Sequence, residues 1–546
     1  MEEVYDEQSF DKQPSVDDRG LVIRSRPAPL PEGPTTTSEA LSAGLNHYPD
    51  RQALVHGPTS FTYAELDARV DAIAGGLTAA GLKPGNVLAC SLPNCTALVE
   101  AFLATQRLGV VWLGINTNLM ADEVDWVQND ANVDLLLTTT NQTKMAGDRP
   151  TLTVNPIDGS GSWTNLITAG HPAPSRSIDP QDPAAIAYTS GTTGRPKGVV
   201  HSQHNLLWPG ISSRHSYPPI PNEQHGTALA LTILNMMVLG PLWAYLRGTT
   251  AVLLEHTDAV GFAEEVRLHG INRVTLVPTM AHDLVTHTEV DLCDLVTLTQ
   301  TIIGAGHSPP ALRNDWEAKF GTRPLVGYGL TEAPSGVTRE HVDRPARPDG
   351  AGYPLEPLRV VVVDDNDHPL PDGDTGEICL APVKDGPWAN VWTPMLGYLN
   401  QPQATAESLR GGVLHTGDLG FLDEHGQLVI RGRRTEMILR GGANVYPAEV
   451  ARVILDHPGV SEVAVLGLPD ERLGEVVVAG LVAESGDWAD GDPAALLEDV
   501  QSYCLNHLAH YKVPAKMLVL HAIPRNAMGK VVEAELRPIF NQTWPT

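Results

Sequence analysis

Hydrophobic and polar positions alternate between two spacings along much of the chain. Apolar side chains recur at helical spacing over Ala68–Ala80, and the apolar run Val87–Leu92 follows a Lys-Pro-Gly turn as a buried strand does. The same order returns with a predicted helix over Glu100–Leu108 and a predicted strand over Val110–Leu113. This rhythm is typical of a layered α/β fold with a largely parallel sheet.

Two further patterns extend this picture. A second α/β unit is expected over residues 184–330, with strands at Ala251–Leu254 and Thr275–Val277. From Arg359 to Ala381 the strand-like segments are separated by Asp-Gly turns, which predicts a small β subdomain.

A smaller unit follows Gly432. Its pattern predicts helices and strands in mixed order, over Pro447–Leu455, Val460–Leu466, Val476–Val482, Leu496–His507 and Met517–Leu520. The chain is therefore expected to divide into a poorly ordered arm (1–36), acidic and then proline-rich, a large domain (37–432) and a small α+β C-terminal domain (433–546).

Composition narrows the class of protein. A length of 546 residues with 42% apolar residues predicts a globular protein of two or more domains. The formal net charge of −28 argues against nucleic acid or an anionic membrane as a partner, because both favour basic surfaces. No apolar run reaches the length of a bilayer span and the start is acidic, so a cytoplasmic location is expected. The five scattered cysteines are interpreted as reduced packing residues, since they lack metal-like spacing.

The stretch with the clearest chemistry is 188–198, which reads Tyr-Thr-Ser-Gly-Thr-Thr-Gly-Arg-Pro-Lys-Gly. Its glycines let consecutive backbone N–H groups converge on phosphate oxygens, while its hydroxyls and Lys197 add donors and a positive charge. It is not a P-loop, because Pro196 precedes the lysine and Gly198 replaces the magnesium-binding Ser or Thr. Strand-like segments on both sides favour a polyphosphate-binding loop over a flexible linker.

This stretch resembles the signature of the adenylate-forming superfamily, which includes acyl-CoA synthetases, aryl-acid ligases, peptide-synthetase adenylation domains and luciferases. Further motifs match in the family's order along most of the chain. They are Phe-Thr-Tyr-Ala-Glu-Leu from Phe61, Gly304-Ala305-Gly306, Tyr-Gly-Leu-Thr-Glu at 328–332, Thr-Gly-Asp at 416–418, Gly432-Arg433, Gly-Gly-Ala-Asn-Val-Tyr-Pro-Ala-Glu at 441–449, Val-Leu-Gly-Leu-Pro-Asp from Val465, and Pro-Arg-Asn-Ala-Met-Gly-Lys at 524–530.

The resemblance implies a site for ATP and Mg²⁺, in which a carboxylic acid becomes acyl-AMP and pyrophosphate is released. Glu332 would ligate the magnesium ion, Thr331 would contact the α-phosphate, and Tyr328 would lie against the adenine. Asp418 suits the ribose hydroxyls, and Arg433 would add a donor fork beside them. The residues expected to bind the nucleotide are Thr189, Ser190, Gly191, Thr192, Thr193, Gly194, Lys197, Gly304, Ala305, Gly306, Tyr328, Gly329, Thr331, Asp418 and Arg433.

By the same resemblance, Lys530 bridges the incoming carboxylate and the α-phosphate, so the expected catalytic residues are Lys530, Thr331 and Glu332. The C-terminal domain would act as a mobile lid with its hinge just after Arg433. Gly441 and Gly442 would then line the tunnel for the acceptor. The family usually carries Asp or Lys at the pivot, where this chain has Thr435.

The acid pocket is expected to be mostly apolar. Asn235 cannot supply the charge with which peptide-synthetase domains hold an α-ammonium group, so an α-amino acid is disfavoured. An aromatic or alicyclic acid with hydrogen-bonding groups is the first expectation and a medium-chain acid the second. Met236 and Met237 fit an ordinary core equally well. The residues expected to line the pocket are Trp208, Asn235, Met236, Leu239, Gly304, Gly329, Leu330 and Gly336.

CoA is the favoured acceptor because it is the usual one in the family. The lid is acidic, however, and Val-Val-Glu-Ala-Glu-Leu follows Lys530 where CoA-forming relatives often carry basic residues, so an amine acceptor that yields an amide comes second. A non-catalytic nucleotide-binding scaffold is the alternative from another class, and retention of Lys197, Glu332, Asp418 and Lys530 argues against it. Luciferase-like oxidation has no positive sign in the sequence.

Overall fold

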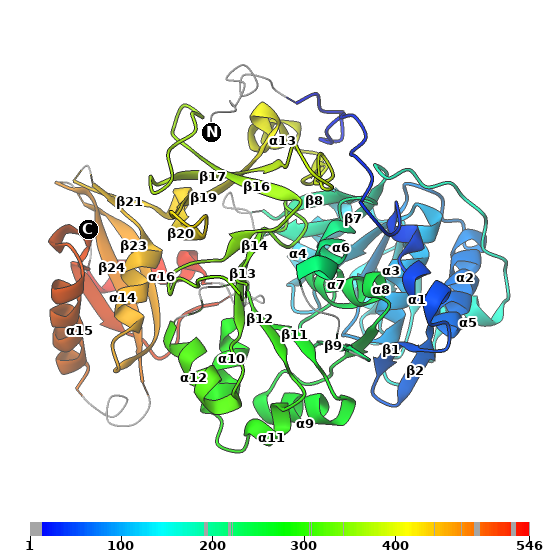
Figure 1. Cartoon of the computed structure of the whole chain (residues 1–546), viewed down its shortest axis with the longest axis horizontal. Coiled ribbons are helices and arrows are strands. Elements are labelled where there is room, and N and C mark those ends of the chain that lie inside the picture. Colours follow the sequence, from blue (N-terminus) through cyan, green and yellow to red (C-terminus); the bar gives the residue numbers. More distant parts are fainter. Residues whose placement is uncertain are drawn as a thin grey trace.

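The computed structural model describes residues 14–189, 195–216, 220, 222–304, 306, 308, 310–341, 343–441, 443–470, 472–484, 492–525 and 531–544. Two α/β layers, a β subdomain and a C-terminal domain are distinct in Figure 1. The fold class predicted from the sequence is confirmed, with helices packed on mixed sheets.

The first sheet has the strand order β18-β8-β7-β4-β3-β5-β6. Its strands are β3 (Val87–Ser91), β4 (Val111–Gly114), β5 (Leu135–Thr138), β6 (Thr151–Thr153), β7 (Pro183–Thr189), β8 (Lys197–Ser202) and β18 (Gly397–Tyr398). Its helices are α2 (Tyr63–Ala79), α3 (Thr96–Leu108), α4 (Ala121–Asp130) and α5 (Ser162–Thr168). Helix α2 starts at a capping box between Thr62 and Glu65, and α3 ends where Gly109 adopts a left-handed conformation. The helices and strands predicted between residues 68 and 113 are thus confirmed.

The second sheet has the order β15-β14-β13-β12-β11-β9-β10-β1-β2 and is parallel from β13 to β1. Its strands are β1 (Gln52–His56), β2 (Thr59–Thr62), β9 (Gln224–Thr227), β10 (Thr250–Leu253), β11 (Arg273–Leu276), β12 (Gln300–Ile303), β13 (Leu325–Tyr328), β14 (Thr338–Arg339) and β15 (Tyr353–Pro354). One face packs on a group of helices, α9 (Ala259–His269), α10 (Pro278–Thr286), α11 (Leu292–Leu295) and α12 (Pro310–Phe320).

The other face meets a second group of helices. These are α1 (Ser42–His47), α6 (Trp208–Ser216), α7 (Leu234–Met237), the π-helical turn η4 (Val238–Leu242) and α8 (Trp243–Arg247). Pro241 lies inside η4, and since proline has no N–H it cannot continue the regular hydrogen-bond ladder.

The expected division into successive α/β units is wrong in one respect. β1 and β2 near the N-terminus belong to the second sheet, where β1 pairs in parallel with β10, while β7 and β8 complete the first sheet. Periodicity reports only local structure, and the partner of a strand is decided by burial between distant segments.

The β subdomain is a four-stranded antiparallel sheet of β16 (Leu358–Val363), β17 (Gly376–Pro382), β19 (Leu414–Leu422) and β20 (Leu428–Arg433), as predicted. Helix α13 (Pro402–Ser408) lies beside it (Figure 1). The C-terminal domain has its own core between five strands and three helices. They are β21 (Ile438–Arg440), β22 (Ala443–Val445), β23 (Val460–Asp470), β24 (Gly474–Ala483), β25 (Lys516–Val519), α14 (Pro447–Leu455), α15 (Pro493–His507) and α16 (Glu533–Thr543).

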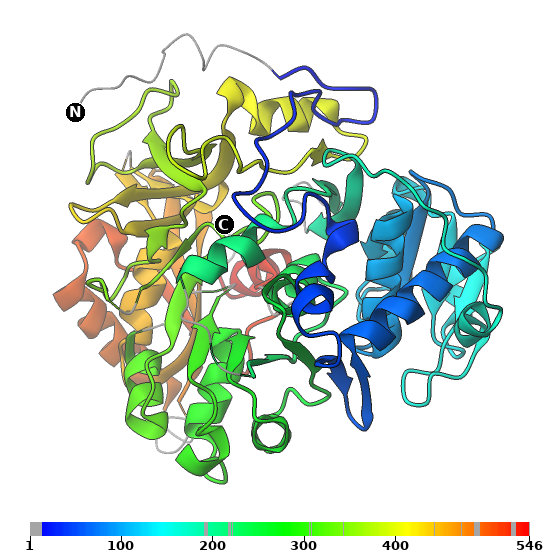
Figure 2. The same cartoon turned by 45° about the vertical axis from the view of Figure 1, so that its right-hand side comes forward.

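Residues 14–36 differ from the poorly ordered arm that their composition suggested. They run beside the segment before α13, as Figure 2 shows from a second side. Val22 N–H donates to the carbonyl of Leu396 at 2.8 Å, and Arg24 donates to the carbonyl of Pro394 at 2.9 Å. Leu21 and Leu30 are buried there. They pack into cores formed by residues far away in the sequence, and this packing holds the segment in place.

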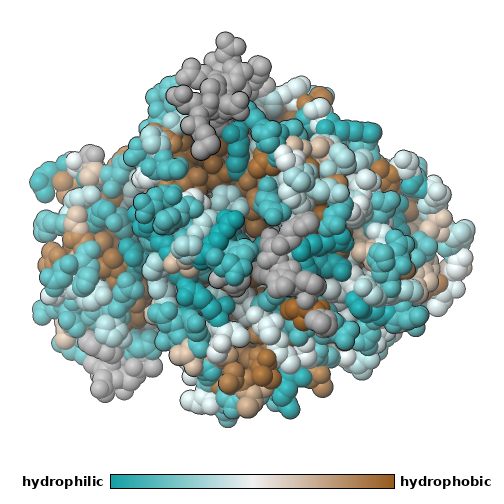
Figure 3. Space-filling view, viewed as in Figure 1, coloured by the Kyte–Doolittle hydropathy of each residue, from teal (hydrophilic) through white to brown (hydrophobic). Residues whose placement is uncertain are grey.

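The surface is mainly hydrophilic in Figure 3, which agrees with the acidic composition. Leu268, Leu292 and Val296, in and beside α9 and α11, are exposed. None of the helices in the described ranges combines the length and hydrophobicity needed to cross a bilayer. All five cysteines are free thiols and four of them are buried, as packing residues are.

Candidate active site

Two of the motifs lie at one edge of the second sheet. β12 and β13 are parallel neighbours, so the segments that follow them emerge on the same side. Gly304 and Gly306 follow β12, and the Gly304 N–H donates to the Leu276 carbonyl of β11 at 3.0 Å. Tyr328 ends β13, and residues 329–332 follow it at the adjacent position.

The expected phosphate loop connects the antiparallel strands β7 and β8, whose last paired residues are Thr189 and Lys197. Ser190, Gly191, Thr192, Thr193 and Gly194 lie outside the described residues. The following part is anchored on α4. Trp126 donates from Nε1 to the Pro196 carbonyl at 3.3 Å, and the Arg195 guanidinium lies 4.5 Å from the Trp126 ring centroid.

Lys197 and Glu332 meet through Tyr398. The Lys197 ammonium lies 4.9 Å from the centroid of the Tyr398 ring, and the Tyr398 hydroxyl donates to Glu332 Oε1 at 2.8 Å. Burial, and then the negative charge of Glu332, raise the pKa of Tyr398, so the phenol stays protonated as a donor. One carboxylate oxygen of Glu332 is therefore oriented by Tyr398, and a half-buried carboxylate held in this way suits a hard cation that also binds phosphate oxygens.

A second cluster joins Tyr328, Asp418 and Arg433. The Tyr328 hydroxyl donates to Asp418 Oδ2, and the Arg433 guanidinium forms an ion pair with Asp418, with Nε 2.9 Å from Oδ1. Burial and the charge of Asp418 raise the pKa of Tyr328 well above its ordinary value. Burial alone lowers the pKa of Arg433, but Asp418 together with Tyr328, Glu332 and Glu436 outweighs this effect and raises the pKa, so the guanidinium stays charged. An ionised acceptor flanked by an aromatic ring and a fixed cation can hold a ribose beside a purine.

Tyr398 was not found from the sequence. It lies 66 positions from Glu332 and belongs to β18, which pairs with β8. Gly397 allows this approach, because its φ of +150° and the overlap of a Cβ with the Gly20 carbonyl oxygen leave no room for a side chain. A Gly-Tyr pair has no distinctive spacing, so only the fold reveals its role.

The turn after β13 folds back on itself. The Val337 N–H donates to the Tyr328 carbonyl at 2.9 Å, and a Cβ on Gly329 would overlap the carbonyl oxygen of Ser335. At the end of this turn, a Cβ on Gly336 would lie 3.9 Å from the ring of Trp208. The predicted pocket residues Trp208 and Gly336 are therefore brought together, although they are far apart in the sequence.

Other predicted pocket residues lie in this turn itself and in α7 and η4. Leu330 is buried in the main core, with Met236 packed against that core, and Asn235 is half-buried in α7. Met236 and Leu239 also line a small cavity against β9 and β11. On the same face of the sheet, Trp243 packs edge-on against His225 with ring centroids 4.9 Å apart.

Two expected residues of the C-terminal domain, Gly442 and Lys530, fall outside the described ranges. Ala305 of the large domain does so too. Arg525 and Val531 form an antiparallel bridge on either side of the lysine segment, and Arg525 pairs with Glu462 at 2.6 Å. Gly441 has a φ of +59° and its N–H donates to the Leu473 carbonyl of the same domain at 2.6 Å.

Thr435, at the expected pivot, lies in a 3-10 turn (Arg434–Glu436). Its neighbour Arg434 reaches the β subdomain, where it pairs with Asp365 and donates to Glu377 Oε2 at 3.2 Å. An arginine one position before the expected pivot thus supplies charge contacts to the large domain.

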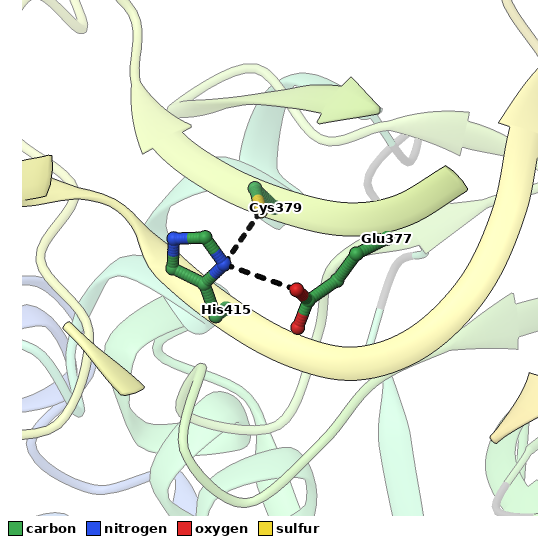
Figure 4. Close-up of side chains that lie close together, drawn as sticks. All are labelled: Glu377, Cys379 and His415. Atoms are coloured by element: carbon green, nitrogen blue, oxygen red, sulfur yellow. Dashed lines mark hydrogen bonds and ion pairs between the residues drawn. The ribbon is translucent and has the colours of Figure 1, made fainter. Parts of the chain in front are cut away.

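Glu377, which accepts from Arg434, also belongs to a cluster of potential metal ligands (Figure 4). Glu377, Cys379 and His415 place ligand atoms within 4.8 Å of one another. Arg410 and Arg434 both donate to Glu377 Oε2, at 3.3 and 3.2 Å, and their charges oppose a cation. Burial raises the pKa of Cys379 well above its ordinary value, whereas a metal-bound thiol is deprotonated. The cluster is therefore a structural hydrogen-bond network.

Comparisons with known proteins agree with this geometry. Residues 41–385 match the family model described as AMP-binding enzyme, and residues 449–530 match the AMP-binding enzyme C-terminal domain. A feruloyl-CoA synthase from an Amycolatopsis species is 32% identical over 511 residues, which covers 91% of this chain and 99% of the relative. A long-chain-fatty-acid–CoA ligase, FadD13 of Mycobacterium tuberculosis, is 30% identical over 506 residues, covering 91% and 97%.

Solved structures are similar over the same extent. ATP-bound MatB from Rhodopseudomonas palustris has a TM-score of 0.84 and 28% identity, and covers 93% of this chain and 99% of that one. The o-succinylbenzoate CoA synthetase MenE from Bacillus subtilis, in complex with an acyl-adenylate intermediate, has a TM-score of 0.79 and 28% identity, with coverage of 91% and 98%.

Proposed function

Because the chain belongs to the AMP-binding enzymes of the adenylate-forming acyl-CoA synthetase superfamily, we propose that it joins a carboxylic acid to the thiol of CoA at the expense of ATP. The observation that carries this proposal is that Lys197 and Glu332 meet through Tyr398, while Arg433 pairs with Asp418 and also feels the charge of Glu332. Binding a nucleotide does not by itself require all of these groups, which disfavours a non-catalytic scaffold.

In the first step, a carboxylate oxygen of the acid attacks the α-phosphorus of ATP, the bond to the β-phosphate oxygen breaks, and pyrophosphate leaves. Asp418 and Tyr328 hold the ribose and adenine, and Lys197 neutralises charge on the departing phosphates. Magnesium, held by Glu332, would supply further charge neutralisation when bound, and the similar MenE from Bacillus subtilis has been solved in complex with ATP and a magnesium ion. Lys530 would bridge the acid and the α-phosphate.

In the second step, the thiolate of CoA attacks the acyl carbon and AMP leaves. Rotation of the C-terminal domain about residues 433–435 would bring Gly441 and Gly442 to the acceptor path. Arg434 would then release Glu377 and Asp365.

For the acid, an aromatic substrate is supported by the similarity to a feruloyl-CoA synthase. The absence of a carboxylate at Asn235 disfavours an α-amino acid, because an α-ammonium group there would lose its counter-charge. A medium-chain acid is the second candidate.

An amine acceptor is favoured by one observation. Three cations of the C-terminal domain are paired with carboxylates of the same domain: Lys512 with Glu449 at 2.7 Å, Arg525 with Glu462 at 2.6 Å, and Arg537 with Glu533 at 3.0 Å. The phosphates of CoA compete with these pairs, whereas an uncharged amine does not.

The decisive experiment has two stages. Acid-dependent exchange of labelled pyrophosphate into ATP, over a panel of aromatic and aliphatic acids, tests adenylation. AMP release is then measured with CoA or with an amine at equal concentration, and mass spectrometry identifies a thioester or an amide. No exchange with any acid would overturn the enzyme assignment, and exclusive amide formation would replace CoA as the acceptor.

A further inference from the structure

One face of the second sheet is polar where it meets α7 and η4. The register pairs His225 with Arg273 and Thr275 with Ile302, so His225, Thr227, Arg273 and Thr275 share this face. Val274 and Leu276 point to the opposite face, into an apolar core. Buried polar side chains normally have hydrogen-bond partners, so each polar atom on this face is expected to have one.

A small cavity separates these side chains from the helix above. His225, Gly226, Thr227 and Thr275 line it from the sheet, and Met236, Leu239 and Gly240 line it from α7 and η4. Its volume of about 10 Å³ has room for about one water-sized group. A Cβ on Gly240 would overlap Thr227 Oγ1, so the glycine keeps this space open.

Two polar atoms at the cavity have no protein partner in the described part of the chain. They are Nδ1 of His225 and Oγ1 of Thr227, both buried. Burial, and then the charges of Arg273 and Arg247, lower the pKa of His225 well below its ordinary value. The imidazole is therefore neutral, with one ring nitrogen as donor and the other as acceptor, and a hydroxyl of Thr227 can do both. Together they suit a group that both donates and accepts.

The cavity lies at the same sheet edge as the nucleotide motifs. Thr227 is the last residue of β9 and Thr275 the penultimate residue of β11, whereas Tyr328 is the last residue of β13. β12 alone separates β11 from β13, so about 10 Å, two strand spacings, lie between them. An acid whose carboxyl group is at Gly304 and Thr331 can reach the cavity if it carries an aromatic ring and a short linker.

We propose that this cavity is a specificity subsite, in which His225 and Thr227 hydrogen-bond a hydroxyl group at the end of the acid far from its carboxyl group. The inference rests on the proposed function and names its substrate class, ring-hydroxylated aryl acids. An alkyl chain of similar length would bury His225 Nδ1 and Thr227 Oγ1 without giving either a hydrogen-bond partner. A site built to hydrogen-bond a hydroxyl group therefore discriminates strongly against substrates that lack one.

The test compares 3-phenylpropenoate with its 4-hydroxy and 4-methyl analogues, at saturating ATP and CoA, by the initial rate of pyrophosphate release. The hydroxyl is expected to raise kcat/KM about tenfold or more over both other acids. Equal use of the three acids would show that the cavity holds only a buried water and would overturn the inference, while leaving the ligase function intact. If neither these acids nor any other supported pyrophosphate release, both proposals would fail.

Variants locate the effect. Thr227→Val keeps the shape and removes the hydroxyl, and His225→Leu removes the ring nitrogens. In either variant, the ratio of kcat/KM for the hydroxylated acid to that for the unsubstituted acid is expected to fall to within about twofold. The control is Thr301→Val, a buried threonine on the opposite face of β12, which is expected to keep the wild-type ratio. Because the ratio is measured within one preparation, partial unfolding does not alter it, and an unchanged ratio in Thr227→Val would refute the subsite.

Discussion

Asp418 and Arg433 are register partners on β19 and β20, and Arg433 Nε lies 2.9 Å from Asp418 Oδ1. The carboxylate is buried, while the guanidinium is 45% exposed at the junction with the C-terminal domain. The group expected to hold the ribose is therefore tied by one ion pair to the residue from which the C-terminal domain departs.

Asp418→Asn is expected to raise the KM for ATP by about 10-fold or more, because a charged hydrogen-bond acceptor contributes about 1.5–3 kcal/mol. Pyrophosphate exchange at varied ATP and saturating acid measures this. Asp423→Asn, which changes a buried carboxylate in the turn after the same strand, is the control and is expected to leave the KM for ATP near that of the wild type. An unaltered KM in Asp418→Asn would contradict the ribose assignment.

Glu332→Gln is expected to raise the Mg²⁺ concentration for half-maximal activity by about 10-fold, since it removes the charge that binds the cation. Tyr398→Phe keeps that charge and loses only the 2.8 Å hydrogen bond, so its shift is expected to be a few-fold at most. Magnesium titration of pyrophosphate exchange gives both values. A larger shift in Tyr398→Phe than in Glu332→Gln would exclude Glu332 as the ligand.

Lys530→Ala is expected to lower the rate of adenylate formation about 100-fold or more, because its ammonium would stabilise charge that develops in the transition state. Quenched single-turnover assays of acyl-AMP, together with equilibrium binding of the acid, separate chemistry from binding. Lys516→Ala on β25, whose ammonium lies over the Trp544 ring, is the matched control. Comparable adenylation rates in both variants would remove Lys530 from the mechanism.

Gly329→Ala and Gly304→Ala are compared for their effects on stability, since both add a Cβ within the candidate site. The first Cβ would overlap the Ser335 carbonyl, whereas the second would lie 3.8 Å from its nearest neighbour, the Gly327 carbonyl oxygen. Thermal unfolding is therefore expected to show a loss of about 1–3 kcal/mol for Gly329→Ala and nearly wild-type stability for Gly304→Ala. Equal melting temperatures would show that the 328–336 turn relaxes without cost.

The pH dependence of stability tests the Glu377 network. Burial by itself raises the pKa of Glu377, but the hydrogen bond from His415 and the charges of His415 and Arg410 outweigh it and hold the pKa below its ordinary value. A lowered carboxylate pKa stabilises the fold above the unfolded value of about 4.3, and this stabilisation is lost as the pH falls through the folded value.

Glu377→Gln is accordingly expected to lower the free energy of unfolding by about 1–3 kcal/mol at pH 7. The difference in the free energy of unfolding between the variant and the wild type should shrink as the pH falls from about 4.3 through the lower folded pKa of Glu377. Urea unfolding at pH 7 and pH 3.5 measures the two differences. A difference that is the same at both pH values would show that ionisation of Glu377 is not the source of its contribution.

Local elements were predictable because their causes are local. The alternation of apolar positions located α2, β3, α3 and β4, and proline with an amphipathic pattern located α14 at its observed bounds. Residues 189–197 were predicted to bind phosphate because glycines, hydroxyls and Lys197 between two strands suit few other roles. The flanking residues, Thr189 and Lys197, do close a hairpin.

The sequence by itself determined the α/β class, the β subdomain and the motifs expected to bind a nucleotide, since backbone periodicity and residue type act over a few positions. Only the tertiary structure decided that β1 joins the second sheet, that residues 14–36 are packed, that Tyr398 orients Glu332, and that His225 and Thr227 line a cavity. These contacts join segments far apart in the chain. Their formation depends on which surfaces are buried together, and local sequence does not specify that.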